Sequence, residues 1–216
     1  KIWGEEHPNI ANILNGIGLL YKLQGSYKKA EEFYIQALQI RQKSFGKEHL
    51  DVASSLNNLA SLYEAQKRFE EAELLHYEAL EIKKKRLGAE HPSVVASLNN
   101  LAVLYDNQGK YQAAESFYRQ ALEMAQKLLG KEHPDVATCF NNLAFLYSKQ
   151  KKYAEAEPLY LQALEMRQKL LGKEHPDVAT SLNNLALLYE SQGKCNSAIS
   201  YLEESIEIFQ KSLGEN

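Results

Sequence analysis

Five histidines stand 42 residues apart and are the first candidates for chemistry in this chain of 216 residues. Imidazole is a frequent metal ligand and general base, so a regular series of histidines raises the question of a metal or catalytic site. Ligands of one zinc ion lie about 2 Å from it, whereas equivalent positions of a repeated structure are separated by at least one helix spacing. Four of the histidines precede a proline at the expected start of a helix, and we therefore expect all five to act as helix caps. They are His7, His49, His91, His133 and His175.

No other group of residues predicts catalysis. Cys139 and Cys195 have no plausible base beside them, and the two thiols are too few for a zinc module or a disulfide framework. His76 occupies a position that is tyrosine in three other repeats, which indicates a packing role. The chain has neither a glycine-rich phosphate loop nor an H-E-x-x-H motif. The sequence thus predicts a protein that is not an enzyme and has no metal or cofactor.

Paired asparagines form the more informative series. A carboxamide offers two N–H donors and one oxygen acceptor, the same groups as a peptide bond, so a row of them could hold an extended peptide by its main chain. The alternative is that the asparagines satisfy one another, or backbone groups, between neighbouring helices. The pairs are Asn57 and Asn58, Asn99 and Asn100, Asn141 and Asn142, and Asn183 and Asn184; the first repeat has Asn15 followed by Gly16.

These series belong to an internal repeat of 42 residues without gaps. In each repeat a first helix with apolar residues at helical spacing is followed by a short turn and a second amphipathic helix. Proline opens four of the first helices and glycine closes the second helices, while Gly16 and Gly18 lie inside a helix and should each cost about 1 kcal/mol relative to alanine. The predicted repeats are approximately 7–48, 49–90, 91–132, 133–174 and 175–216, in a single domain 1–216 that we expect to be part of a longer array.

The third repeat contains Leu98-x2-Leu101-Ala102-x2-Tyr105, followed by Ala114-x3-Tyr118. This pattern resembles the tetratricopeptide repeat, and the longer unit, with L-G-K-E-H-P-D-V-A-T before L-N-N-L-A-x-L-Y, is similar to the repeats of kinesin light chains. The resemblance implies an all-α, right-handed superhelical solenoid of five helix-turn-helix repeats and ten helices. It also implies that the face carrying the asparagines lines a concave groove.

The predicted function is therefore a protein–protein interaction scaffold of the kinesin light chain cargo or adaptor type, which binds an extended peptide or a protein partner in this groove. Exposed apolar residues one turn beyond the asparagines should select ligand side chains; they are Val103, Phe145 and Leu187. A basic clamp for a terminal carboxylate is disfavoured, because the corresponding groove positions are uncharged and the next turn is slightly acidic on balance.

The composition of the chain disfavours several other classes of function. The chain has 25 basic and 28 acidic residues, a formal charge of −3, which disfavours binding to nucleic acid or to an anionic membrane through bulk charge. No apolar run is long enough to span a bilayer, and we expect a cytoplasmic protein.

The second helix of the last repeat carries apolar residues without a polar cap. The alternative function is thus a structural spacer, or a module that self-associates through this C-terminal helix, in a larger multidomain signalling protein.

Overall fold

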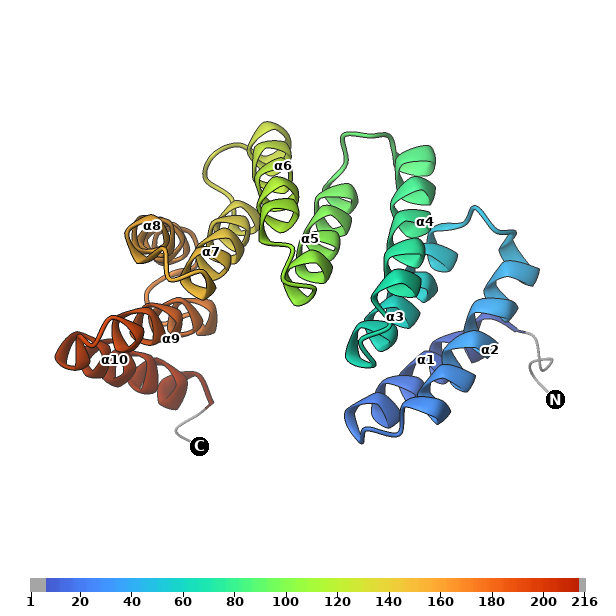
Figure 1. The fold of residues 1–216 in the computed structure, drawn as a ribbon, viewed down its shortest axis with the longest axis horizontal. Helices are drawn as coiled ribbons and strands as arrows, with labels where there is room; N and C mark the ends of the chain where they lie inside the picture. The colour runs from blue at the N-terminus through green and yellow to red at the C-terminus, as the bar shows by residue number, and fades with distance from the viewer. Residues whose placement is uncertain (1–6, 214–216) are drawn as a thin grey trace. The chain divides into compact units, whose positions relative to one another are not determined.

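The computed structural model describes residues 7–213, and this part of the chain contains ten α-helices and no strand. The prediction of an all-α protein with five helix-turn-helix repeats is confirmed. Every first helix has 16 residues and every second helix has 19, and both recur every 42 residues (Figure 1). The first helices are α1 (Pro8–Leu23), α3 (Leu50–Ala65), α5 (Pro92–Asn107), α7 (Pro134–Lys149) and α9 (Pro176–Ser191). The second helices are α2 (Tyr27–Phe45), α4 (Phe69–Leu87), α6 (Tyr111–Leu129), α8 (Tyr153–Leu171) and α10 (Cys195–Leu213).

The histidine series caps the first helices, as predicted. In each repeat the imidazole Nδ1 accepts a hydrogen bond from the backbone N–H two residues later, at 3.0–3.2 Å. The bond satisfies one of the N–H groups that a helix leaves without an intrahelical partner at its start. These histidines therefore stabilise helix starts.

The turn between the two helices of a repeat requires a left-handed residue. Gly25, Gly109 and Gly193 have φ near +75°, which glycine adopts without steric cost. The second and fourth repeats have Lys67 and Lys151 at this position, and both lysines adopt the same region with φ of 60° and 61°. The backbone of the turn is thus conserved even where glycine is absent.

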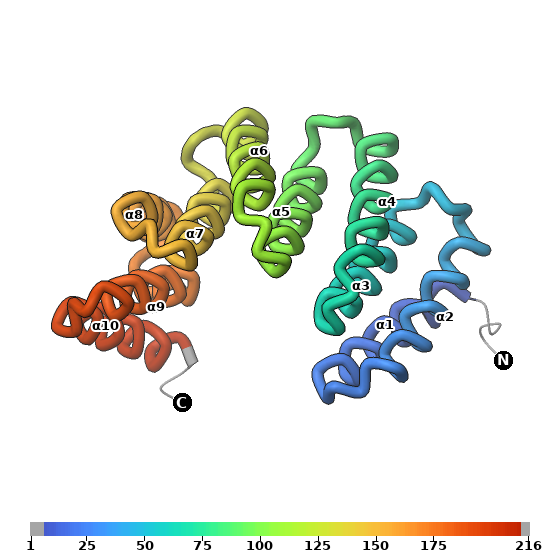
Figure 2. The backbone as a smooth tube through the Cα atoms, in the orientation of Figure 1, coloured from blue at the N-terminus to red at the C-terminus, as the bar shows by residue number. Residues whose placement is uncertain are grey.

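Contacts divide the chain into two compact units, residues 1–110 and 111–216. The first unit contains α1 to α5, and the second contains α6 to α10 (Figure 2). Within each unit, consecutive helices pack against one another. In the first unit, Tyr34 packs with Leu59 and Leu62 of the next repeat, so the core is shared between repeats. This sharing is expected of a solenoid, in which no repeat can bury its apolar faces alone.

Two pairs of polar side chains recur at the junctions between repeats. In the first pair, a first-helix tyrosine donates its hydroxyl to a glutamate of the preceding second helix, at 2.7–2.9 Å. The four instances are Tyr63 to Glu31, Tyr105 to Glu73, Tyr147 to Glu115 and Tyr189 to Glu157.

In the second pair, a cation of the second helix donates to a buried serine hydroxyl of the next first helix. Arg41 donates to Ser55 at 2.8 Å, Lys83 to Ser97 at 2.8 Å, and Arg167 to Ser181 at 2.7 Å. At the remaining internal junction, Ala125 and Cys139 occupy these positions, and both are buried. The cation and the hydroxyl are therefore present together or absent together.

The expectation that Gly18 weakens its helix needs correction. A Cβ atom at Gly18 would lie 2.8 Å from two ring atoms of the buried Tyr34, so glycine is required by close packing. A Cβ atom at Gly16 would meet nothing within 4 Å, and the expectation stands there. Gly214, predicted to close the last helix, lies outside the described residues.

Candidate functional site

The asparagine face of the first unit lines an open cavity of about 490 Å³ between successive first helices. Four of the residues predicted from the sequence contribute to it, namely Asn57, Asn58, Asn100 and Val103. Ser61, Glu64, Ala65, His76 and Asn107 complete the lining. Helical spacing explains the grouping, because residues three and four apart lie on one face of a helix.

His76 forms the polar floor of this cavity. It comes from α4, it is 3% exposed, and its Nδ1 lies 2.8 Å from the Asn57 Oδ1 atom while its Nε2 lies 2.9 Å from the Glu64 Oε1 atom. The Asn57 carboxamide is therefore turned towards the protein, and its neighbour Asn58 is exposed to solvent. Of the pair in this repeat, Asn58 is the better placed to meet a ligand.

Glu64 and Lys22 set the charge around the cavity. Glu64 also accepts a hydrogen bond from Asn107 Nδ2 at 3.1 Å, and Lys22 Nζ donates to Ser61 Oγ at 2.6 Å. Burial lowers the pKa of Lys22, and the nearby Glu64 carboxylate partly opposes this effect. A cation and a carboxylate thus lie on the same surface, which is consistent with a polar rather than a strongly charged recognition site.

In the second unit, the asparagines form a bond between repeats. Asn184 Nδ2 donates to Asn141 Oδ1 at 2.7 Å, and the first unit has a longer counterpart from Asn58 to Asn15 at 3.4 Å. The arrangement in which asparagines satisfy one another is therefore observed for two pairs. Each such bond uses one N–H group and one oxygen, so part of the capacity of each carboxamide is left for a ligand. The other predicted asparagines, Asn99, Asn142 and Asn183, are half-buried on the same helices.

The apolar residues predicted to select ligand side chains lie at the surface. Val103, Phe145 and Leu187 are 41%, 48% and 50% exposed. The ammonium group of Lys149 lies 5.9 Å from the centre of the Phe145 ring and 6.0 Å from that of Tyr111. This corner of the second unit therefore combines aromatic and cationic groups.

The sequence did not indicate that Glu64 and His76 line the cavity together. The available signal is the exchange of tyrosine for histidine at position 76, which by itself indicates only a packing role. Helical spacing places Asp106 on the same face of α5 as Val103, and the structure nevertheless buries it at 5% exposure. Neither difference is visible from helical spacing, because each depends on how the second helix covers the first.

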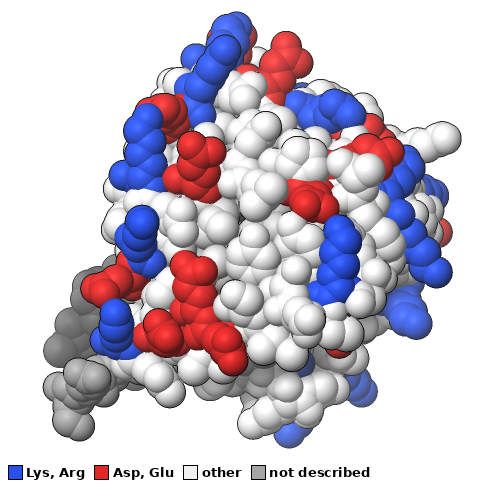
Figure 3. Space-filling view, turned by 90° about the vertical axis from the view of Figure 1, so that its left-hand side faces the viewer, with Lys and Arg blue, Asp and Glu red and all other residues white. Residues whose placement is uncertain are grey.

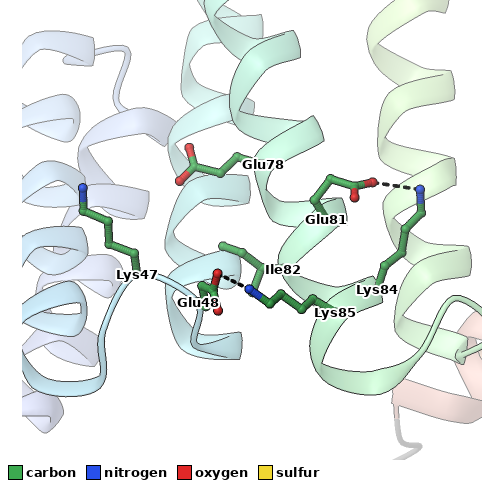
Figure 4. Close-up of a pocket in the computed structure, with 7 residues that line it drawn as sticks. All are labelled: Lys47, Glu48, Glu78, Glu81, Ile82, Lys84 and Lys85. Carbon is green, nitrogen blue, oxygen red and sulfur yellow. Dashed lines mark hydrogen bonds and ion pairs between the residues drawn. The ribbon is translucent and has the colours of Figure 1, made fainter.

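A larger cavity of about 580 Å³ lies between α4 and the loop that joins α2 to α3, and it is lined mainly by charged residues (Figure 4). Its side chains largely pair with one another: Lys85 binds Glu48, and Lys84 lies 2.9 Å from Glu81. Equivalent pairs, Lys169 with Glu132 and Lys211 with Glu174, recur in the second unit. These ion pairs fasten second helices to the loops before first helices, so the cavity is explained by repeat architecture.

Chemistry of other kinds finds little support. Within residues 7–213 there is no group of three or more His, Cys, Asp or Glu side chains that could hold a metal ion. Cys139 is buried and Cys195 is exposed. None of the described helices is both long enough and apolar enough to cross a membrane.

Comparison with known proteins identifies the family. The family model of the tetratricopeptide repeat matches residues 9–85, 75–127, 93–169 and 135–211, and the chain therefore belongs to the tetratricopeptide repeat family. This family is generally a non-enzymatic scaffold that binds protein or peptide partners. No curated protein matches the chain.

Similar solved structures include proteins of the kinesin light chain type. The crystal structure of BtubC (BKLC) from P. vanneervenii is 28% identical with a TM-score of 0.75, and the match covers 97% of this chain and 83% of that one. A candidate kinesin light chain of Podosopora anserina with nearly identical tetratricopeptide-like repeats is 30% identical with a TM-score of 0.71, covering 95% of this chain and 98% of that one. RapI in its apo form shares the fold alone, at 18% identity and a TM-score of 0.62, over 96% of this chain and 85% of that one.

Proposed function

We propose that this protein is a cytoplasmic scaffold that binds an extended peptide, or an extended segment of a protein partner, along the asparagine face of its first helices. The observation that carries the proposal is the open cavity shared by Asn58, Asn100 and Val103. It combines carboxamides that match the main chain of a peptide with an apolar side chain that can select a residue. The likeness to kinesin light chain repeats supports a cargo or adaptor role.

The spacing of the repeats supports an extended ligand. Adjacent first helices of a solenoid lie roughly 8–10 Å apart, and an extended chain advances about 3.3 Å per residue. Each repeat would then meet about three ligand residues. Main-chain binding by carboxamides would give affinity without strict sequence preference, and Val103, Phe145 and Leu187 would supply the preference.

The test is a peptide-display selection on the parent protein beside a variant with Asn58→Ala, Asn100→Ala and Val103→Ser. Asn57 stays unchanged because its bond to His76 contributes to the packing of the repeat. Peptides enriched by the parent and lost by the variant would support the proposal, and their shared residues would define the ligand class. Glu81→Ala with Lys84→Ala in the outer charged cavity is the matched control and should select the parental peptides. Identical selections by the parent and the groove variant would refute groove binding.

The second candidate function is a spacer or a self-association module. It is favoured by the apolar side chains that α10 exposes, of which Ile199 is 53% and Ile206 is 54% exposed. Sedimentation at several concentrations distinguishes the two candidates, because a groove that binds peptides needs no dimer. A protein that remains monomeric at every concentration would argue against self-association.

A further inference from the structure

Asparagines of successive first helices are joined by hydrogen bonds at two places in the chain. Asn58 Nδ2 donates to Asn15 Oδ1 at 3.4 Å in the first unit, and Asn184 Nδ2 donates to Asn141 Oδ1 at 2.7 Å in the second. In both cases the second asparagine of one repeat donates to the first asparagine of the repeat before it. We call such a bond an asparagine bridge.

The junction between α3 and α5 has both asparagines but no bridge. The residues in the equivalent positions are Asn57 and Asn100. The oxygen of Asn57 lies 2.8 Å from Nδ1 of His76, which is 3% exposed. Asn100 is half-buried and lines the cavity, and its carboxamide makes no hydrogen bond within residues 7–213. Its two N–H donors and its oxygen are therefore available to a ligand.

One residue of the second helix distinguishes the junctions with a bridge from the junction without one. Where a bridge forms, the accepting asparagine belongs to a repeat with tyrosine at this position, namely Tyr34 or Tyr160. Burial raises the pKa of both phenols, and both rings are 3% exposed or less. Where the bridge is missing, the residue is His76. Its ring has two nitrogen atoms, and they contact Asn57 and Glu64 at the same time.

A different polar bond joins α3 to α5 in place of the bridge. Glu64 Oε2 accepts a hydrogen bond from Asn107 Nδ2 at 3.1 Å. Glu64 follows Asn57 by about two helical turns, and residues from both positions line the cavity of about 490 Å³. The two repeats are therefore still linked by a side-chain bond, while the carboxamide of Asn100 is left free at the cavity.

We propose that His76 prevents the asparagine bridge between α3 and α5, and that it thereby makes their cavity the main anchoring point for a ligand in the first unit. The free carboxamide of Asn100 would pair with one peptide group of the ligand, donating to its C=O and accepting from its N–H. Val103 lines the same cavity and would contact the neighbouring ligand side chain. His76 acts through Asn57 and is therefore a positioning residue. The inference rests on the proposed function and names the group by which the groove would hold its peptide.

An uncharged peptide main chain suits this cavity better than a charged group. The two charged side chains beside it are already engaged, because Lys22 Nζ donates to Ser61 and the Glu64 carboxylate contacts both Asn107 and His76. Figure 3 faces the second unit and shows basic and acidic side chains alternating along one edge. That face therefore offers a charged ligand no alternative anchor of a single sign.

The experiment compares the parent with His76→Tyr in the binding of a random peptide library displayed on phage. Three other repeats have tyrosine at this position with 2–3% exposure, so the fold should persist. The substitution would release the Asn57 oxygen and allow Asn100 to donate to it. The peptide that the parent enriches most should bind His76→Tyr at least about tenfold more weakly in a calorimetric titration, which is equivalent to about 1.4 kcal/mol.

A rescue variant separates this role from simple packing. In the His76→Tyr background, Asn57→Ala removes the competing acceptor and should free Asn100 again. The double variant should recover most of the tenfold loss, whereas a purely structural histidine predicts a further loss. Leu74→Ala is the control, because Leu74 lies on the same helix as His76, is 71% exposed and is outside the cavity lining. It should bind the peptide like the parent.

A double-mutant cycle tests the bridge without any peptide. In the parent, Asn57→Ala and Asn100→Ala should change the free energy of unfolding additively, because the two side chains are not bonded to each other. In the His76→Tyr background the same two changes should be non-additive, because the bridge has formed. Additivity in both backgrounds would show that His76 does not control the bridge.

The outcomes distinguish this inference from the proposed function. If peptides are enriched but His76→Tyr binds them as tightly as the parent, the groove binds peptides and the inference is wrong. The inference is also wrong if His76→Tyr binds weakly and Asn57→Ala does not restore binding. If the parent enriches no peptide, the proposed function fails and the anchoring role of Asn100 fails with it, while the cycle still decides whether His76 prevents the bridge.

Discussion

Two neighbouring junctions of the second unit solve the same packing problem in different ways. Between α8 and α9, Arg167 is 8% exposed and donates to the Asp177 carbonyl, to Ser181 and to Thr138. Between α6 and α7, the equivalent positions are Ala125 and Cys139, and both are buried. The comparison shows that a buried position can hold a cation or an apolar group, provided that its partner changes with it. An unpaired buried cation would be costly, whereas a fully apolar pair is not.

The largest effect is expected from breaking the Arg167 junction. Arg167→Ala removes three charge-assisted hydrogen bonds and leaves the Ser181 hydroxyl buried without its donor. We expect a loss of about 2 kcal/mol in the free energy of unfolding, measured by urea denaturation. Arg167→Lys is the matched control and should lose less, since Lys83 serves the same role at another junction. If Arg167→Ala leaves the free energy of unfolding unchanged, the cost of desolvating the buried guanidinium cancels the stabilisation from its hydrogen bonds.

The converse test places a cation at the apolar junction between α6 and α7. Ala125→Arg places a cation against Cys139 and should destabilise the protein, and adding Cys139→Ser should recover part of the loss by restoring the hydroxyl. Recovery should be incomplete, because the third repeat has Ala96 where the first and fourth have Asn12 and Thr138. A double-mutant cycle measures the coupling. Strict additivity of the two changes would show that residues 125 and 139 are independent.

Alkaline pH should weaken the hydrogen bond from tyrosine to glutamate that both junctions contain. Burial and a hydrogen bond to glutamate raise the pKa of Tyr147 and of Tyr189, and the same causes act on Tyr63 and Tyr105. The folded state therefore keeps phenolic protons that the unfolded chain releases above about pH 10. Stability from these groups is present below that pH and is lost as the pH rises further.

Urea denaturation at a series of pH values measures this loss. Replacing Tyr147 and Tyr189 by phenylalanine should lower stability at neutral pH and flatten the decline above about pH 10. Tyr111→Phe lies outside the glutamate pairs and serves as the control, with a decline like that of the parent. An unchanged slope in the double variant would exclude these tyrosines as the cause.

The first repeat extends the comparison to two glycines inside α1: Gly16 stands where the other four repeats have asparagine, and Gly18 stands where they have alanine. Gly16→Ala should raise the free energy of unfolding by about 1 kcal/mol, because alanine is the better helix former and its Cβ meets open space. Gly18→Ala gains the same propensity but brings its Cβ to 2.8 Å from the Tyr34 ring. We expect it to be neutral or destabilising. The two alanine variants are each other's controls, and equal urea midpoints would contradict the packing argument.

Much of the fold follows from the sequence, because an unbroken period of 42 residues places every helix and turn. The face that carries Asn57, Asn100 and Val103 also follows, since it depends only on helical spacing. The bond from Arg167 to Ser181 could not be predicted, because it depends on the orientation of two successive helices. The same is true of His76 beside Glu64, and of the ring of Tyr34 above Gly18. In each case the contact lies between helices, whereas periodicity describes one helix at a time.

The smallest effect concerns the inter-helix turns of the fourth and fifth repeats. Lys151 adopts φ of 61° where Gly193 has 75°. The left-handed region costs an ordinary residue roughly 1–2 kcal/mol, and a glycine at this position avoids that cost. Part of the benefit is lost again, because glycine has greater conformational freedom in the unfolded chain. Lys151→Gly should therefore raise the free energy of unfolding by about 0.5–1 kcal/mol. Gly193→Lys should lower it by a similar amount, so the two variants are each other's controls. If Lys151→Gly is destabilising, the side chain of Lys151 contributes more to stability than its left-handed backbone costs.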